Sequence, residues 1–229
     1  MKDGADCARN ILLGDYVPGE EIKAVSAGDK KLSETDFPKS VDDLTKIYSY
    51  ANDKAISSDY NTGLTDFANE ESAMFLSGNW TFASIRGINP DIKIEQFPLP
   101  SSAGRGYICS GVDVGYTIGA NTKYPEACNA FVNFLVSPPQ AEKYCNLDAA
   151  IPAIKDVVIE DTTAKRMVDK VAKGESFNWP NHFFPAGGAE QLANQASTQF
   201  YMDIVELGEE QAKKNYIAQM DGIMDGSIK

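Results

Sequence analysis

Residues 67–80 read FANEESAMFLSGNW, and three successive local structures can be predicted from this stretch. Its first residues end a short helix predicted over 64–70, and the apolar run over 72–77 predicts a buried strand. Gly78 permits a sharp change of direction directly before Asn79 and Trp80. The stretch therefore predicts a helix, a strand and a turn that carries a large aromatic side chain.

Downstream of this turn the sequence favours extended structure. Residues 92–97 alternate apolar and polar side chains, as a half-buried strand does, and Pro98 and Pro100 prevent its continuation inside a sheet. Residues 107–120 read YICSGVDVGYTIGA, which is rich in β-forming residues but interrupted by Gly111 and Gly115. This pattern predicts a strand that bends or crosses between layers.

Helical patterns dominate the rest of the chain. Pro125 and Pro138 suit the first turn of two successive helices, and further helices are predicted over 163–173, 189–207 and 209–224. Upstream, residues 40–55 show helical spacing, whereas residues 1–36 fit neither period and are predicted to be irregular. The apolar positions of the helices are expected in the core. Strands interleaved with helices indicate an α/β or α+β fold, with too few strands for a complete doubly wound sheet.

Composition excludes several classes of partner. The 229 residues carry a formal net charge of -12, which repels phosphate backbones, so we expect no nucleic-acid partner. The chain has no run of 18 apolar residues, and MKDGADCARN at its start has no signal-peptide pattern. The four cysteines lack C-x-x-C spacing, so we expect neither a zinc site nor a redox motif; whether any pair forms a disulfide stays open.

The stretch from Phe67 to Val136 resembles the central signature of family 1 extracellular solute-binding proteins, the group that includes maltose-binding protein. Four features in order carry the resemblance: Phe67 with AM at 73–74 and GNW at 78–80; FPLP at 97–100; SGV at 110–112 with Ile118; and KYPEACNAFVNFLVSPPQ at 123–140. The IPA at 151–153 is similar to a turn that follows this helix pair in the family.

The resemblance implies an α/β, periplasmic-binding-protein-like (class II) fold of two lobes. It further implies that this chain is the carboxy-terminal portion, helix-rich and incomplete, and lacks an N-terminal part. Residues 1–110 are then expected mainly in the second lobe, 111–180 in a segment returning to the first lobe, and 181–229 in helices packing back on the second.

The implied function is capture of a carbohydrate between the lobes for an ABC-type importer. Permease membrane subunits are the implied protein partners, and the chain itself is expected to be a monomer. The implied location is extracellular or periplasmic, with a lipoprotein anchor in the full-length protein. Cys7 lacks the apolar leader that such an anchor requires.

A sugar site pairs aromatic platforms with fixed hydrogen-bonding groups, because sugars present apolar CH faces and rims of hydroxyls. The resemblance implies that Trp80 stacks on sugar; a core role is the alternative. Asn79 can bond a hydroxyl or simply stabilise the turn. Gly111 lets backbone amides approach a ligand, and Asp113 on the same strand face can accept two hydroxyls or remain solvated.

The loop FNWPNHFF at 177–184 is dense in aromatic residues. Loop aromatics are harder to explain as core than a helical stripe, so Trp179, His182 and Phe183 are secondary ligand-binding candidates. The alternative is that they seal the junction between the lobes.

Other functional classes find less support. His182 is the only histidine, and no nucleophile motif or phosphate loop is present, so an enzyme is not expected. We expect no cofactor and no metal. A binding protein for a polyamine, a peptide or another small solute is the main alternative, since carboxylates around aromatics suit a polyamine. A purely structural or interaction module is the third class.

Overall fold

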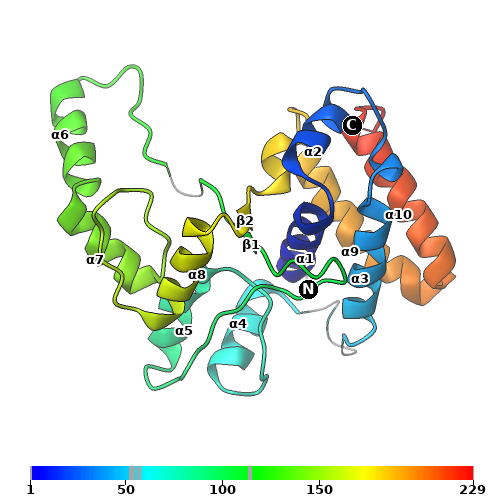
Figure 1. The fold of residues 1–229 in the computed structure, drawn as a ribbon, viewed down its shortest axis with the longest axis horizontal. Coiled ribbons are helices and arrows are strands. Elements are labelled where there is room, and N and C mark those ends of the chain that lie inside the picture. Colours follow the sequence, from blue (N-terminus) through cyan, green and yellow to red (C-terminus); the bar gives the residue numbers. More distant parts are fainter. Residues whose placement is uncertain (1, 52–54, 56–57, 113–114, 229) are drawn as a thin grey trace.

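The computed structural model describes residues 2–51, 55, 58–112 and 115–228, and it is built mainly of helices (Figure 1). The helices are α1 (Lys2–Tyr16), α2 (Gly19–Ser26), α3 (Phe37–Tyr48), α4 (Tyr60–Ala68), α5 (Phe82–Ile88), α6 (Pro125–Leu135), α7 (Pro138–Asp148), α8 (Thr162–Ala172), α9 (Ala189–Leu207) and α10 (Glu209–Met224). Short 3-10 helices are η1 (Leu32–Glu34), η2 (Asn79–Thr81) and η3 (Pro180–Phe183). The strands β1 (Ile108–Cys109) and β2 (Ser176–Phe177) pair in parallel.

The helices with clear start signals are confirmed. Both α6 and α7 begin at the predicted prolines, whose fixed φ and missing N–H suit a first turn. The bounds of α9 and α10 are those read from periodicity, and Gly208 separates the two helices with φ +84°. Residues 189–224 therefore specify their hairpin locally.

The irregular structure predicted for residues 1–36 is wrong, because this region forms α1 and α2. The buried side of α1 carries Ala5, Ala8 and Leu12, spaced three and four residues apart. Two small alanines and the interior Gly14 weaken this apolar signal in the sequence. Gly14 is needed for packing, since a Cβ there would lie 2.2 Å from the Phe177 ring.

Most predicted strands are also wrong. Among the described residues, 72–77 and 92–97 belong to no strand, and within 107–120 only Ile108–Cys109 does. A strand needs a hydrogen-bonded neighbour, and β2 is the partner that the described residues supply to β1. Extended, apolar sequence alone does not create that neighbour.

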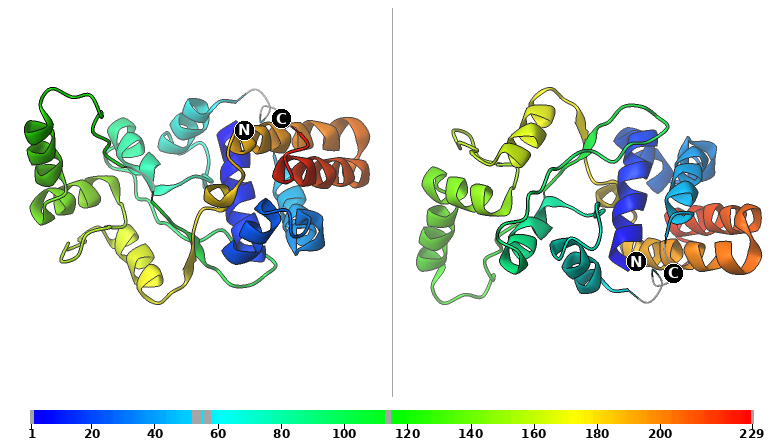
Figure 2. Two further views of the ribbon diagram at one scale, coloured as in Figure 1. Left: turned by 90° about the horizontal axis from the view of Figure 1, so that it is seen from above. Right: turned by 90° about the horizontal axis from the view of Figure 1, so that it is seen from below.

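The main core joins the two ends of the chain. Side chains of α1, α2 and α3 pack with those of α9 and α10, and Figure 2 shows these helices on one side of the molecule. Phe200 stacks on Tyr216 with ring centroids 4.6 Å apart, and Tyr48 packs against Phe200 at 5.7 Å. The hydroxyls of Ser197 and Tyr216 lie 3.0 Å apart, which gives each buried group a hydrogen-bonding partner.

The other side of the molecule holds α4 to α8 around smaller cores (Figure 1). The expectation that helical apolar residues lie in the core is wrong for α6, which has no buried residue. Phe131 is 62% and Phe134 is 54% exposed. Neighbouring exposed apolar side chains of this kind form a surface suited to contact with another protein surface.

Among the described residues, which include all four cysteines, no disulfide is formed. No helix in the described part of the chain is long and apolar enough to cross a membrane.

Candidate functional site

The two tryptophans of the chain come together from segments a hundred residues apart. Trp80 lies in η2 and Trp179 directly before η3, and their ring centroids are 6.0 Å apart at an angle of 46°. Both are partly exposed. The structure thus forms a pair of neighbouring aromatic surfaces that solvent or a ligand can reach.

Gly111 and His182 border this pair. A Cβ built on Gly111 would lie 3.3 Å from Cδ1 of Trp179 and 3.4 Å from Cε1 of His182. Both Gly111 and His182 are exposed. The missing side chain at Gly111 therefore lets the backbone after β1 lie against the aromatic loop.

The local sequence positions Trp80 through Gly78. The Trp80 ring folds back over this glycine so closely that a Cβ there would lie 1.9 Å from the ring. The Thr81 hydroxyl donates to the Gly78 carbonyl at 2.8 Å and closes the turn. The glycine before the tryptophan is therefore a steric requirement of this ring position.

Two other predicted residues have structural contacts. The Asn79 side-chain amide donates to the Ala149 carbonyl at 3.4 Å and links η2 to the end of α7. The Phe183 ring packs against Gly19 and lies 5.2 Å from the Lys23 ammonium, and its carbonyl accepts a hydrogen bond from the Ser26 hydroxyl. Asp113 lies outside the described residues.

A pocket of about 550 Å³ opens beside Trp80. It lies between the first turns of α1, the start of α4 and the segment that leads into η2. Its lining residues are Asp6, Cys7, Ser58, Asp59, Tyr60, Gly63, Phe75, Leu76, Ser77 and Trp80. The sequence prediction missed its α1 wall because residues 1–36 gave no clear helical period.

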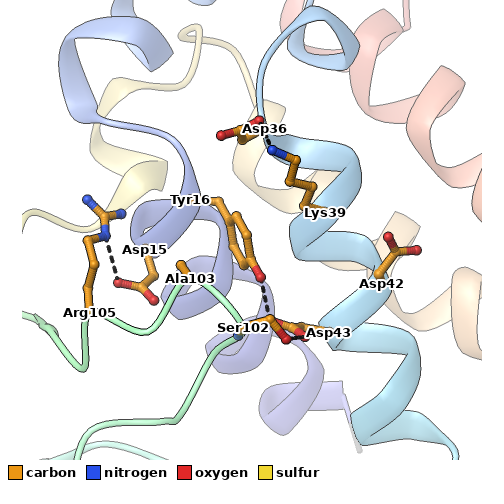
Figure 3. A pocket seen from close by; sticks show the side chains of 9 residues that line it. All are labelled: Asp15, Tyr16, Asp36, Lys39, Asp42, Asp43, Ser102, Ala103 and Arg105. Carbon is orange, nitrogen blue, oxygen red and sulfur yellow. Dashed lines mark hydrogen bonds and ion pairs between the residues drawn. The ribbon is translucent and has the colours of Figure 1, made fainter.

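A second pocket, of about 590 Å³, lies between α1, α3 and the loop 101–106 (Figure 3). Asp43 accepts from the Tyr16 hydroxyl at 2.7 Å and from the backbone N–H of Ser102 at 2.7 Å. Burial and the hydrogen bond to Asp43 raise the pKa of Tyr16 to about 12. Burial alone would raise the pKa of Asp43, but the hydrogen bonds from Ser102 and Tyr16 lower it.

The polar groups of this second pocket are engaged in contacts within the protein, and those of Asp15 and Asp43 hold the loop. Asp15 accepts from the Ser101 hydroxyl and forms an ion pair with Arg105 Nε at 3.2 Å, and Asp36 pairs with Lys39 at 2.8 Å. Figure 3 shows the Asp15–Arg105 and Asp36–Lys39 ion pairs on either side of the Tyr16 ring. We therefore assign the pocket that Trp80 lines, although it is slightly smaller, as the candidate ligand site.

The fold is that of a solute-binding protein. The chain superposes over 97% of its length on the solute-binding protein RafE in complex with raffinose, with a TM-score of 0.68 and 20% identity. The apo-form of RafE from Streptococcus pneumoniae superposes on 97% of this chain with a TM-score of 0.68 and 18% identity. A chitin oligosaccharide binding protein superposes on 98% of this chain with a TM-score of 0.67 and 13% identity. At these identities the likeness shows the fold alone.

Sequence comparison gives the family. Residues 6–169 match the model of the bacterial extracellular solute-binding proteins, and the chain belongs to this family. A multiple sugar-binding protein of Streptococcus mutans is 27% identical over 136 residues, which are 56% of this chain and 32% of that protein. The chain spans 57–60% of the solved relatives named above. The resemblance predicted from residues 67–136 is confirmed, together with the helix-rich, solute-binding fold.

Proposed function

We propose that the chain binds a neutral carbohydrate as part of the extracellular substrate-binding component of an ABC-type importer. The observation that carries this proposal is that Trp80 lines an open pocket and that the Trp179 ring lies 6.0 Å from the Trp80 ring. Aromatic rings pack on the CH faces of sugars, and the surrounding polar groups supply hydrogen bonds to hydroxyls. Gly111 and His182 border the same surface.

The comparisons support a saccharide over other solutes. The names of the relatives specify multiple sugars, raffinose and chitin oligosaccharide as the ligands of those proteins. Within the proposed site, Trp80 and Trp179 act as platforms, Asp113 and His182 as hydrogen-bonding groups, and Asn79 as a support for the η2 turn. Phe183 has the contacts of a residue that fastens η3 to α2.

We further infer that the chain acts by binding and not by catalysis, as a solute-binding protein does. Ligand capture closes two lobes by a hinge near Gly111, with residues 1–110, 111–180 and 181–229 distributed as the resemblance predicts. The closed form presents the sugar to the permease subunits outside the cytoplasmic membrane, where the full-length protein is held as a lipoprotein.

One observation favours a second candidate, a polyamine. Asp6 and Asp59 both line the pocket beside Trp80, and carboxylates around an aromatic ring suit an organic cation. Spermidine is therefore included in the test.

The test is a calorimetric titration of the chain with raffinose, sucrose, maltotriose, chitotriose and spermidine. It is made with the 229-residue chain and with the chain extended upstream by the segment that the resemblance predicts. Saturable binding of a saccharide by either form is the expected result. Binding of spermidine alone, or no binding by both folded forms, would overturn the proposal.

A further inference from the structure

Asp6 belongs to a wall of the candidate pocket that carries none of the site residues predicted from the sequence. It lies in the first turns of α1 and lines the same pocket as Trp80. Its side chain is 26% exposed, whereas Arg9, one turn further along the helix, is 1% exposed. The carboxylate therefore stands between a buried cation and an open pocket.

The orientation of Asp6 is fixed by its neighbours on α1. Its Oδ1 accepts from Arg9 Nη2 and from the Asn10 side-chain amide at 3.2 Å. Arg9 in turn donates from Nη1 to Asn194 Oδ1 of α9 at 2.8 Å, and its guanidinium lies 5.8 Å from the centre of the Phe184 ring. A chain of contacts from α9 thus holds the carboxylate in place before any ligand arrives.

We propose that Asp6 accepts a sugar hydroxyl opposite Trp80 and selects neutral saccharides over acidic ones; this inference rests on the proposed function. A carboxylate offers about four acceptor positions, and hydrogen bonds to a charged acceptor are stronger than neutral ones. A uronic acid would place a second carboxylate there, which is also an acceptor, carries a like charge and cannot donate a hydrogen bond to Asp6. Asp59, which also lines the pocket, adds repulsion of the same sign.

The fixed position of the Asp6 carboxylate favours tight binding of a sugar hydroxyl. A preoriented acceptor loses little side-chain freedom when a hydroxyl arrives, so more of the hydrogen-bond energy appears as affinity. Arg9 contacts the Asp6 carboxylate directly and holds it in this position. Asp6 is therefore a binding and specificity residue, while Arg9 is a positioning residue behind it.

The experiment compares the wild type with Asp6→Asn, using whichever saccharide of the panel binds most tightly, its monodeoxy analogues and the corresponding uronate. Asp6→Asn should lower affinity for the neutral sugar at least tenfold and reduce the discrimination against the uronate by a similar factor. One deoxy analogue should bind about tenfold more weakly than the parent sugar to the wild type, but less than twofold more weakly to the variant. A purely structural role for Asp6 would leave the deoxy penalties equal in both proteins.

Two further variants keep the inference falsifiable. Asp6→Glu preserves the charge facing Arg9 but moves the carboxylate by one methylene, so it should keep the thermal midpoint and still lose affinity. Asp15→Asn removes the same charge from the same helix at the other pocket and should change sugar affinity less than twofold. Sugar binding unchanged in a folded Asp6→Asn protein overturns the inference alone. Absence of saccharide binding by the wild type overturns the proposed function as well.

Discussion

The contact between α5 and α8 holds the helix that follows Trp80, and its main element is Asp161. This residue caps α8, since its Oδ1 accepts from the backbone N–H groups of Thr163 at 2.9 Å and Ala164 at 3.2 Å. Its Oδ2 accepts from Arg86 Nη2 of α5 at 2.6 Å. Replacing Asp161 by asparagine retains an acceptor for the cap but removes the charge that faces Arg86.

The magnitude follows from the pKa of Asp161. Burial alone would raise this pKa, but the hydrogen bonds from Thr163, Arg86 and Ala164 and the charge of Arg86 outweigh burial and lower it from 3.8 to about 2. The Asp161 side chain is 14% exposed, so solvent screens the interaction only in part. At about 1.4 kcal/mol per pKa unit, the ionised form contributes roughly 2 kcal/mol to stability.

The sign of the pH dependence is fixed by the lowered pKa in the folded state. The contribution is fully present above the unfolded-state pKa and is lost as the pH falls from about 4 to about 2. Urea denaturation at pH 7 should therefore show Asp161→Asn to be about 2 kcal/mol less stable than the wild type, with the difference shrinking below pH 4. Asp169→Asn, at an exposed position of the same helix, should show neither effect. An equal deficit of Asp161→Asn at pH 7 and pH 3 would refute the role of the charge.

Two further predictions concern packing. Gly14→Ala places a Cβ 2.2 Å from the Phe177 ring and should lower the free energy of unfolding, measured by urea denaturation, by about 1–3 kcal/mol. Gly87→Ala lies in α5 with open space around it and should raise that free energy by about 0.5–1 kcal/mol. Equal effects of the two substitutions would contradict the packing described for α1. Phe131→Ser combined with Phe134→Ser should reduce binding of a dye for exposed apolar surface and any self-association of the chain, because both rings lie on the exposed side of α6. Unchanged dye binding in a folded variant would show that the apolar surface lies elsewhere.

The parts of the fold that the sequence predicts are those specified by local chemistry. Prolines at 125 and 138 and the glycine at 208 fix helix ends without help from distant residues. The failures have distant causes. The helix α1 packs against α3 and against α9 near the other end of the chain, and the need for Gly14 is explained by Phe177, which lies more than 160 residues away.

In the candidate site, too, local features could be predicted from the sequence, whereas contacts between distant segments could not. Trp80 could be singled out because Gly78 precedes it, and Trp179 because it lies in a loop dense in aromatics. Their proximity could not be read from the sequence, since it depends on β1 pairing with β2 and on the close approach permitted at Gly111. Asp6 was missed because its helix was missed.

Binding of a saccharide against the paired tryptophans can be followed through their own fluorescence emission. The chain has two tryptophans, Trp80 and Trp179, and both belong to the proposed site, so the whole signal comes from it. We predict a saturable emission change with the saccharide identified by calorimetry, and an affinity at least tenfold weaker for Trp80→Ala when followed through Trp179. Calorimetric saccharide binding that leaves the emission unchanged and persists at wild-type affinity in Trp80→Ala would show that the sugar does not bind at the tryptophans.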